Sequence, residues 1–467
     1  MAKKNAVDAK SYRKVGLLDY ISYAAGDFGC NMSFALASTW LTLFYTQYMG
    51  IPAVLFAGLL VVLKVWDGIN DPLIGGLIDS SKKQYKRGKF KTFIFYGSFG
   101  LLISAALCFL PVPGAPLAAK VALCLVGYMA WDACYTIVNV PYGSMLATIS
   151  ADSGDRAQLG AWRSVGAMVA SVPVGIVLPM VLYDANQQLM GDRLFFTALA
   201  LGVIGLIAFQ FMVHTTIERV EIPAEVRQND FHFFKAVKNF AHNRPAIGST
   251  IATCMMLFGM MGSATALQVM FQTYFHNTAV SGLSTLAMSL PMFLFMPFLR
   301  KLVTKGKKEA AERWLLLSLV ATFLMIVVPM PANNTGVAIF MALMLLNGIG
   351  LGMITCVGNA MMADAIDYGE YVDGVREEGT IYAVQSLFRK VTQGVAPSIC
   401  LLVMVAFGYN ETLGAAQPAD VAANMKLLVG ILLFAGNLLT WAAVKFIYPL
   451  TKDKVEEMET ALGRNRK

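Results

Sequence analysis

Two aspartates lie four residues apart inside an otherwise apolar stretch that reads KVWDGINDPLIGGLIDSS. On a helix, Asp67 and Asp71 share one face about one turn apart. Lys64 precedes them on the same side, and Asn70 adds an amide oxygen. Carboxylates with neutral oxygens suit a small hard cation, whereas two neighbouring carboxylates can also share a proton. The pattern predicts a Na⁺ or H⁺ site. An ion pair of Lys64 with Asp67 that only stabilises the bundle is the alternative.

Two more aspartates lie within apolar runs. Asp27 is flanked by glycines in AAGDFGCN, and Asp132 begins a polar stripe in WDACYTIVNV that continues with Thr136 and Asn139 one and two turns on. Charges inside a membrane span are costly and usually face a cavity or a partner. We therefore expect Asp27 to face a substrate, with a structural hydrogen bond as the alternative. For Asp132, a packing role and a functional role are equally compatible with the pattern.

Lys390 lies inside the apolar segment YAVQSLFRKVTQG. Lys390 needs a counter-charge at this depth, and we expect it to pair with Asp67 and Asp71. A mobile cation and a fixed ammonium would then compete for one acidic pair, whereas a permanent salt bridge is the alternative. Arg389 points about 100° away around the helix, so we expect it to snorkel or to pair elsewhere.

The amino-acid composition indicates that these residues lie in a membrane protein. The 467 residues are 57% hydrophobic and only 14% charged, with a mean hydropathy of +0.59. A soluble domain has about 25% charged residues, whereas a spanning helix needs about 20 apolar residues. The chain is therefore predicted to be an all-α polytopic membrane protein whose partner is the lipid bilayer. The net charge is +8, and the basic residues lie in short loops. This distribution indicates a signal for membrane topology rather than nucleic-acid binding.

Apolar runs predict twelve transmembrane helices in two six-helix bundles. The expected spans are 17–48, 52–79, 92–111, 117–148, 160–183, 193–214, 246–275, 279–299, 312–330, 336–366, 379–408 and 425–449.

The longest polar stretch, residues 215–245, divides the spans into six and six. We therefore expect an N-terminal bundle (1–214), a central cytoplasmic loop (215–245), a C-terminal bundle (246–450) and a cytoplasmic tail (451–467). Two similar halves with a substrate site near the midplane are a common plan for secondary transporters. Lys and Arg concentrate in the N-terminal tail and in residues 82–91 and 300–313, so both termini are predicted to be cytoplasmic.

Acidic residues gather just before the eleventh span. They are expected to form ion pairs with the basic loops and so to close an inner gate, whereas a solvated loop is the alternative. The residues assigned to this gate are Asp79, Asp364, Asp367, Glu370 and Arg376.

Other chemistries find little support in the sequence. The four histidines lie at span ends or in loops, and no pair among the seven cysteines has metal-ligand spacing. A histidine proton relay, a resident metal and an organic cofactor are therefore not expected.

Four segments taken together resemble the glycoside–pentoside–hexuronide:cation symporter family, the group of melibiose permease within the major facilitator superfamily. The segments are WDGINDPLIGGLIDSSKKQYKRGKFK, YTIVNVPYGSM, DRAQLGAWRS and ADAIDYGEYVDGVREEGTIYAVQSLFRK. The resemblance runs from about residue 17 to about residue 450. It implies twelve helices and sugar import driven by Na⁺ or H⁺.

The resemblance also implies roles for individual residues. Asp67, Asn70, Asp71 and Thr136 match the cation site, and Lys390 matches the membrane lysine. In the same way, Asp27 and Arg163 match the sugar-contacting carboxylate and arginine. Asn139 and Gly143 stand where melibiose permease has an aspartate and a tryptophan, which weakens the case for galactosides. A neutral amide would not repel an anionic sugar, so neutral β-glycosides, pentosides and hexuronides all remain open.

The sequence thus predicts a cation-coupled sugar symporter of a bacterial cytoplasmic membrane, functional as a monomer. Lys64, Asp132 and Lys390 are assigned to coupling. Tyr135 and Tyr142, together with Trp131, are candidate aromatic platforms for the sugar, and packing in the core is the more usual role of such residues. One alternative is a transporter of a lysolipid or an organic anion. The other is a Mg²⁺-dependent intramembrane prenyltransferase, which would need a second acidic cluster facing the first.

Overall fold

The computed structural model describes residues 13–80, 85, 87–150, 152–219, 240–295, 306–374 and 378–462. Helices dominate this part of the chain, where the only β structure is one isolated bridge between Tyr183 and Leu189. The all-helical architecture predicted from composition is confirmed.

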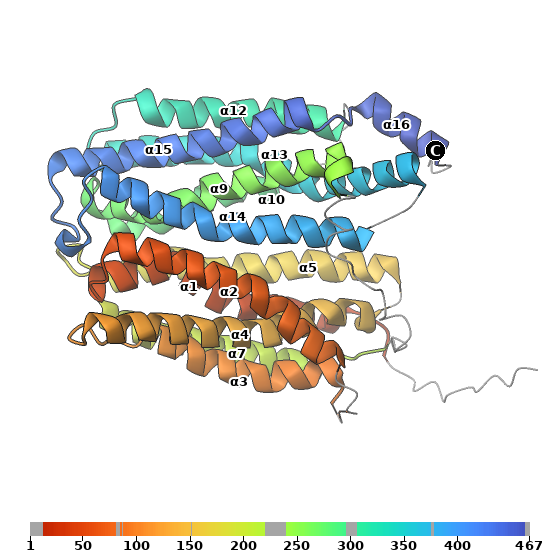
Figure 1. The fold of residues 1–467 in the computed structure, drawn as a ribbon, viewed down its shortest axis with the longest axis horizontal. Helices are drawn as coiled ribbons and strands as arrows, with labels where there is room; N and C mark the ends of the chain where they lie inside the picture. Colours follow the sequence, from red (N-terminus) through yellow and green to blue (C-terminus); the bar gives the residue numbers. More distant parts are fainter. Residues whose placement is uncertain are drawn as a thin grey trace, which may run out of the picture.

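The N-terminal half forms one group of helices, which lies in the lower part of Figure 1. Its long helices are α1 (Leu17–Leu43), α2 (Ala53–Ser80), α3 (Lys89–Cys108), α4 (Leu117–Ile149), α5 (Ser153–Val172) and α7 (Gly191–Thr215). Short segments extend two of them: η1 (Phe44–Tyr48) continues α1, whereas η2 (Pro173–Val177) and α6 (Leu178–Leu182) continue α5.

The C-terminal half forms the second group, which lies in the upper part of Figure 1. Its members are α9 (Arg244–Thr273), α10 (Ser281–Phe295), α12 (Lys307–Val327), α13 (Asn334–Asp373), α14 (Glu378–Ala406) and α15 (Ala419–Ala442). The short helix α16 (Lys452–Ala461) packs against α12 and α13. The two halves meet where α2 packs on α14 and where η2 packs on α10.

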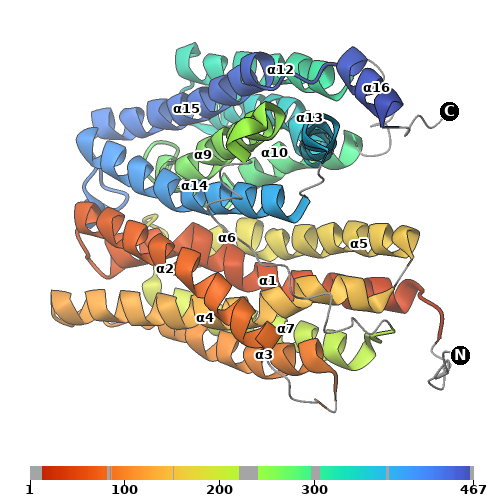
Figure 2. The same ribbon diagram turned by 45° about the vertical axis from the view of Figure 1, so that its right-hand side comes forward.

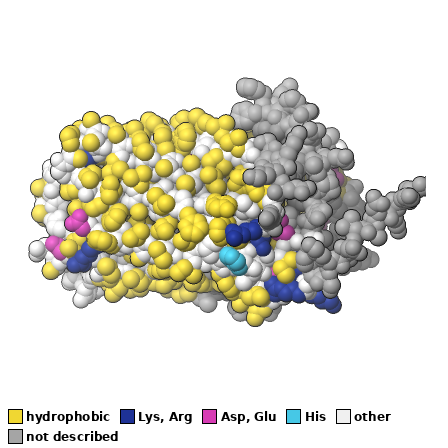
Figure 3. Space-filling model, turned by 90° about the horizontal axis from the view of Figure 1, so that it is seen from below, with side chains coloured by type: hydrophobic (Ala, Val, Ile, Leu, Met, Phe, Trp, Pro, Cys, Tyr) yellow, Lys and Arg dark blue, Asp and Glu magenta, His cyan; other side chains and the backbone are white. Residues whose placement is uncertain are grey.

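The outer surface is suited to lipid. Ten of the described helices are long and apolar enough to cross a membrane, and α1 and α10 correspond to the other two predicted spans. Figure 3 shows a broad band of hydrophobic side chains on the face of the N-terminal half, with Lys, Arg, Asp and Glu gathered toward the ends of the band. Exposed residues of this kind include Tyr96, Ile103, Phe196 and Ile207. The protein is therefore a multi-pass membrane protein.

Two helices extend well beyond the predicted spans. Helix α5 begins at Ser153 rather than at 160, because the Asp152 side chain caps it by accepting a hydrogen bond from the Asp155 amide at 2.9 Å. Helix α13 continues to Asp373 rather than to 366 and ends at Gly374, whose φ of 68° suits glycine. Hydropathy marks the apolar part of a helix, and both extensions are polar helix ends that it cannot detect.

The molecule has two different ends. Residues 13–16 and 448–462 lie at the same end of the molecule, on opposite halves, and we call this the terminal end (Figure 2). The opposite end, called the closed end here, carries residues 49–52, 183–190, 274–280 and 407–418, and amide side chains join the two halves there. Gln47 Nε2 donates to Gln272 Oε1 at 2.9 Å, and Gln272 Nε2 donates to the Gln187 carbonyl at 2.9 Å. Gln187 Oε1 in turn accepts hydrogen bonds from the amide and the hydroxyl of Thr278 at 2.9 and 2.7 Å.

One backbone contact brings the halves especially close at the closed end. Gly282, at the start of α10, lies against the carbonyl of Gly175 in η2, so that a Cβ on Gly282 would collide with that oxygen. A Cβ on Gly175, in contrast, would meet no atom within 4 Å. The pair therefore offers a substitution with a matched control.

We expect Gly282→Ala to push α10 away from η2 and to open the closed end. Overpacking of this kind costs about 1–3 kcal/mol, which corresponds to about a 5- to 150-fold change in an opening equilibrium. The measurement is the rate at which a maleimide labels the half-buried position of Ala279→Cys in detergent-solubilised protein. Gly282→Ala should raise this rate and Gly175→Ala should not; equal rates in the two variants would contradict the contact.

Candidate functional site

A cavity of about 190 Å³, called the charged cavity here, lies between α2, α4 and α14, near the middle of all three helices. It joins residues from both halves of the chain. Its lining includes Phe34, Lys64, Asp67, Asp71, Tyr128, Trp131, Asp132, Tyr135, Asn139, Arg389, Lys390 and Gln393. Most of the ionisable residues predicted inside spans therefore surround a single space.

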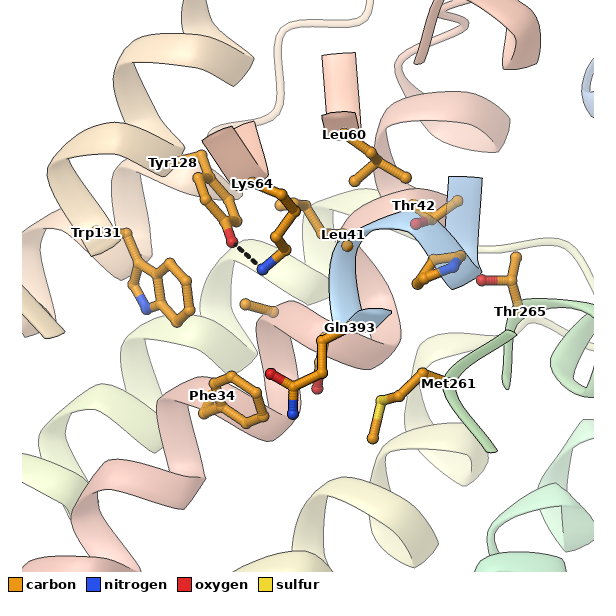
Figure 4. Close-up of a pocket in the computed structure, with 14 residues that line it drawn as sticks. Phe34, Leu41, Thr42, Leu60, Lys64, Tyr128, Trp131, Met261, Thr265 and Gln393 are labelled. Carbon is orange, nitrogen blue, oxygen red and sulfur yellow. Dashed lines mark hydrogen bonds between the residues drawn. The ribbon is translucent and has the colours of Figure 1, made fainter. Parts of the chain in front are cut away.

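Lys64 and Asp67 form an ion pair within α2. Lys64 Nζ lies 2.7 Å from the hydroxyl of Tyr128 (Figure 4). It also lies 2.7 Å from Asp67 Oδ2, to which the Tyr128 hydroxyl donates at 3.1 Å. Both charged side chains are largely buried, with exposures of 24% and 13%. Tyr128 lies one turn before Asp132 on α4, which is a spacing that could have identified it from the sequence.

A chain of hydrogen bonds connects the remaining polar residues of α2 and α4. Asn70 Nδ2 donates to Asp132 at 2.8 Å and to Thr136 at 3.2 Å. The Thr136 hydroxyl then donates to Asp71 at 2.7 Å. The predicted polar stripe of α4 thus faces the acidic face of α2. Asp132 contacts Asn70, which links it to the network.

An ion pair between Lys390 and Asp71 connects the two halves. Lys390 belongs to α14 and Asp71 to α2, and both side chains are about one-third exposed to the cavity, at 33% and 30%. Lys390 thus pairs with Asp71 as expected, whereas the ion pair of Asp67 is formed with Lys64 on its own helix, which was the alternative considered for Lys64. Each carboxylate of the pair therefore has a separate ammonium.

The cluster offers oxygen atoms to a small cation. Asp67 Oδ1 is buried and has no hydrogen-bond partner, whereas Asp71, Thr136 and Asn70 place further oxygens on adjoining turns. Among the described residues, no group of three or more His, Cys, Asp and Glu could hold a metal ion. The arrangement thus fits an alkali cation or a proton better than a tightly held transition metal.

A larger cavity of about 420 Å³ lies between α1, α5, α10 and α13, and we call it the large cavity. The Arg163 Nε donates to Asp27 Oδ1 at 2.8 Å across this space, and Asn31 donates to Asp27 Oδ2 at 3.0 Å. Asp27 is 8% exposed and Arg163 is 38% exposed. Asp27 and Arg163 are 136 residues apart, so their pairing could not be inferred from local spacing in the sequence. In the structure the two residues are in contact at the cavity wall.

The aromatic residues of α4 differ in their access to the cavities. Trp131 and Tyr135 stack with ring centroids 5.5 Å apart, and both line the charged cavity. Tyr142 is 0% exposed and donates its hydroxyl to the Tyr23 carbonyl at 2.8 Å. The prediction that Tyr142 is a platform for a sugar is therefore wrong for this conformation. The centroid of its ring lies 5.0 Å from the Arg163 guanidinium, so Tyr142 stabilises the arginine by a cation–π contact.

A small pocket of about 60 Å³ continues from the charged cavity toward the closed end. Figure 4 shows Lys64 and Tyr128 on one side, with Gln393 and Phe34 nearby. Gly394 on α14 lies against the aliphatic stem of Lys64, and a Cβ at this position would collide with that stem. The absence of a side chain at Gly394 thus fixes how closely α14 can approach the Lys64–Asp67 pair.

The predicted inner gate is only partly covered by the described residues. Asp364 on α13 accepts from Lys307 on α12 at 2.6 and 2.8 Å. Lys307 belongs to the basic segment 300–313, so this ion pair joins an acidic residue to a basic segment as expected. Both helices belong to the C-terminal half, so this particular pair does not bridge the two halves. Asp367 and Glu370 lie on the last turns of α13 rather than in a loop. The side chain of Asp79 and all of Arg376 lie outside the described residues.

Arg389 was expected to snorkel or to pair elsewhere, and the structure places it at the site itself. Its exposed side chain lines the charged cavity beside Lys390. Two residues that differ by about 100° around a helix can both reach a cavity when the helix forms a whole wall of it. Helical periodicity in the sequence does not show how much of the surface of α14 lines the cavity.

We expect Gly394→Ala to displace Lys64 and to weaken the packing of α14 on α2. The destabilisation should be about 1–3 kcal/mol, as for other overpacked interiors, and it is measured as a lower thermal unfolding midpoint in detergent. Gly58→Ala is the control, because Gly58 lies on α2 with no atom within 4 Å of an added Cβ. If both variants unfold at the wild-type temperature, the close contact is not formed.

Comparisons with known proteins agree with this arrangement. An uncharacterized symporter YjmB of Bacillus subtilis is 28% identical over 95% of both chains. A glucuronide carrier protein homolog of Escherichia coli is 26% identical over 96% of this chain and 95% of its own. Among solved structures, a bacterial homologue of the iron transporter ferroportin in its inward-facing state has a TM-score of 0.63, with 11% identity over 92% of this chain and all of its own; this shows a shared fold.

The family described as MFS/sugar transport protein matches residues 22–452, which is nearly the whole described bundle. A transporter family over this length excludes the prenyltransferase alternative, and the protein is not an enzyme. From its fold, its paired charges around a central cavity and this match, the chain belongs to the MFS/sugar transport family.

Proposed function

We propose that this protein is a cation-coupled symporter that imports a glycoside, pentoside or hexuronide by alternating access. The observation that carries the proposal is the ion pair between Lys390 and Asp71, which joins the halves beside a cluster of carboxylate, amide and hydroxyl oxygens. The coupling ion is Na⁺ or H⁺, and the symporter similar to this chain supports ion coupling. All of these residues come from one chain, so a monomer is a sufficient functional unit.

The distribution of basic residues supports a terminal end that faces the cytoplasm of a bacterial cell. The closed end, with its amide hydrogen bonds between the halves, would then face outward. In this orientation the hydrogen bonds that join the halves lie on the outer side, as expected for an inward-facing state. The Asp27–Arg163 pair on the wall of the large cavity would be reached from the cytoplasm.

The cation would bind at Asp67, Asn70, Asp71 and Thr136. A positive charge at this point neutralises part of the acidic pair and so weakens the attraction between Asp71 and Lys390. Lys390 would then be released from α2, which removes one ion pair from the contact between the halves. Asp132 would respond to the same ion through Asn70, to which it is hydrogen-bonded.

The sugar would bind between the two cavities. Asp27 and Arg163 offer a carboxylate and a guanidinium to ring hydroxyls, whereas Asn139 and Tyr135 offer neutral donors and acceptors. Hydroxyl groups of Ser164, Ser171, Ser289 and Thr355 add to the lining of the large cavity. The rest of the lining is largely apolar and includes Met168, Met260 and Met288, so the sugar would take its polar contacts from these few groups.

We expect Asp71→Asn to abolish cation-driven accumulation of the sugar. The neutral amide removes one charge from the cation site, and concentrative uptake in vesicles should fall by about 10-fold or more. Because this change leaves Lys390 without its partner, the double variant Asp71→Asn, Lys390→Gln serves to restore stability without restoring uptake.

Asp192→Asn is the matched control, since Asp192 is an exposed carboxylate at the closed end that contacts only Tyr48 among the interactions found for it. Its uptake should equal that of the wild type. Full accumulation by Asp71→Asn, at wild-type protein levels, would refute the assigned cation site.

We also expect the sugar and the cation to strengthen each other's binding by the same factor. Coupling free energies between two sites are reciprocal, with typical factors of about 5–150. Calorimetry on the purified protein would measure sugar affinity at saturating and at zero Na⁺, at two pH values, and then cation affinity with and without sugar. Equal affinities with and without both ions would rule out symport.

A further inference from the structure

Arg389 is the one cationic side chain of the charged cavity that has no partner within the described part of the chain. Lys64 is paired with Asp67, and Lys390 is paired with Asp71. The third carboxylate of the lining, Asp132, accepts from Asn70 instead. Arg389 is exposed, lines the same cavity and makes no hydrogen bond or ion pair with any described residue.

An unpartnered guanidinium inside a membrane protein requires an explanation. Arginine keeps its charge at any physiological pH, and its five N–H groups form a rigid fork that matches a carboxylate or a sulfonate. Charged groups within spans are retained where they contact a partner, a substrate or an ion. Since its own chain supplies no partner among the described residues, the natural partner of Arg389 is an anionic group that enters the cavity.

The charge balance of the cavity leads to the same conclusion. Three carboxylates (Asp67, Asp71 and Asp132) face three cationic side chains (Lys64, Arg389 and Lys390), so the lining is formally neutral. One bound Na⁺ or H⁺ then gives it a charge of +1. A substrate with one negative charge restores neutrality, which lowers the electrostatic energy of the occupied cavity.

The remaining polar residues of the lining do not oppose an anion. Asn139 is a neutral amide and Tyr135 carries a phenol, and both line the charged cavity with Arg389. We propose that the substrate is a sugar acid with a single negative charge, and that Arg389 selects it by binding its carboxylate or sulfonate. This inference rests on the proposed function and adds to it a substrate class and a specificity-determining residue.

The test measures binding of three probes to the purified full-length protein in lipid nanodiscs with Na⁺ present. The probes are methyl β-glucuronide, a methyl β-glucoside that carries a sulfonate at carbon 6, and the neutral methyl β-glucoside. We expect the wild type to bind at least one of the acidic probes about 10-fold or more tightly than the neutral probe, because a hydrogen bond to a charged group is strong. The two acidic probes distinguish a carboxylate from a sulfonate.

Arg389→Gln should weaken binding of the acidic probe by about 10–100-fold and leave the neutral probe within about 2-fold of the wild type. Arg389→Lys should restore part of the loss, because it retains the charge without the planar fork. Arg244→Gln is the control. Arg244 is an exposed arginine at the terminal end that donates to the Phe446 carbonyl, and it lines none of the three cavities described above.

Failure of the inference and failure of the proposed function give different results. Equal wild-type affinity for acidic and neutral probes, or an equal loss of both in Arg389→Gln, overturns the role of Arg389 while sugar binding remains. If no probe binds and none is accumulated with a Na⁺ or H⁺ gradient, the symport proposal itself is overturned.

Discussion

Charges within a membrane bundle must be compensated locally, and this constraint explains the centre of the molecule. Helix α2 carries Lys64, Asp67 and Asp71 within eight residues, so it holds one more carboxylate than ammonium groups on that face. The negative charge of Asp67 is balanced by Lys64 on the same helix. The charge of Asp71 is met by Lys390, which belongs to the other half of the protein. The electrostatics of one helix therefore fix how the two halves meet.

The two halves are joined by chemically different contacts at different depths. At the closed end the contacts are neutral amide hydrogen bonds and a close backbone approach of Gly282 to Gly175. Near the middle the contact is an ion pair that lines a cavity. Neutral hydrogen bonds respond weakly to a bound ion, whereas an ion pair responds strongly. This difference provides a physical basis for an ion to act on the middle of the interface first.

Helix positions and most of the polar cluster followed from simple patterns in the sequence. The apolar runs located the helices because lipid requires long apolar segments, and the four-residue spacing of Asp67 and Asp71 placed both on one face. The stripe of Asp132 and Thr136 was predicted in the same way, and its contact with Asn70 and Asp71 agrees with it. The polar extensions of α5 and α13 escaped notice, since hydropathy detects only the apolar part of a helix.

Partner choice was decided by the tertiary structure. The sequence by itself determined that buried acids and amines exist and which helix face each one occupies, because helical periodicity is a local property. It did not determine that Arg163 reaches Asp27, that Tyr142 is covered or that Arg389 enters the cavity. These outcomes depend on how closely whole helices approach one another, as at Gly394. They also depend on how much of each helix surface lines the shared cavity.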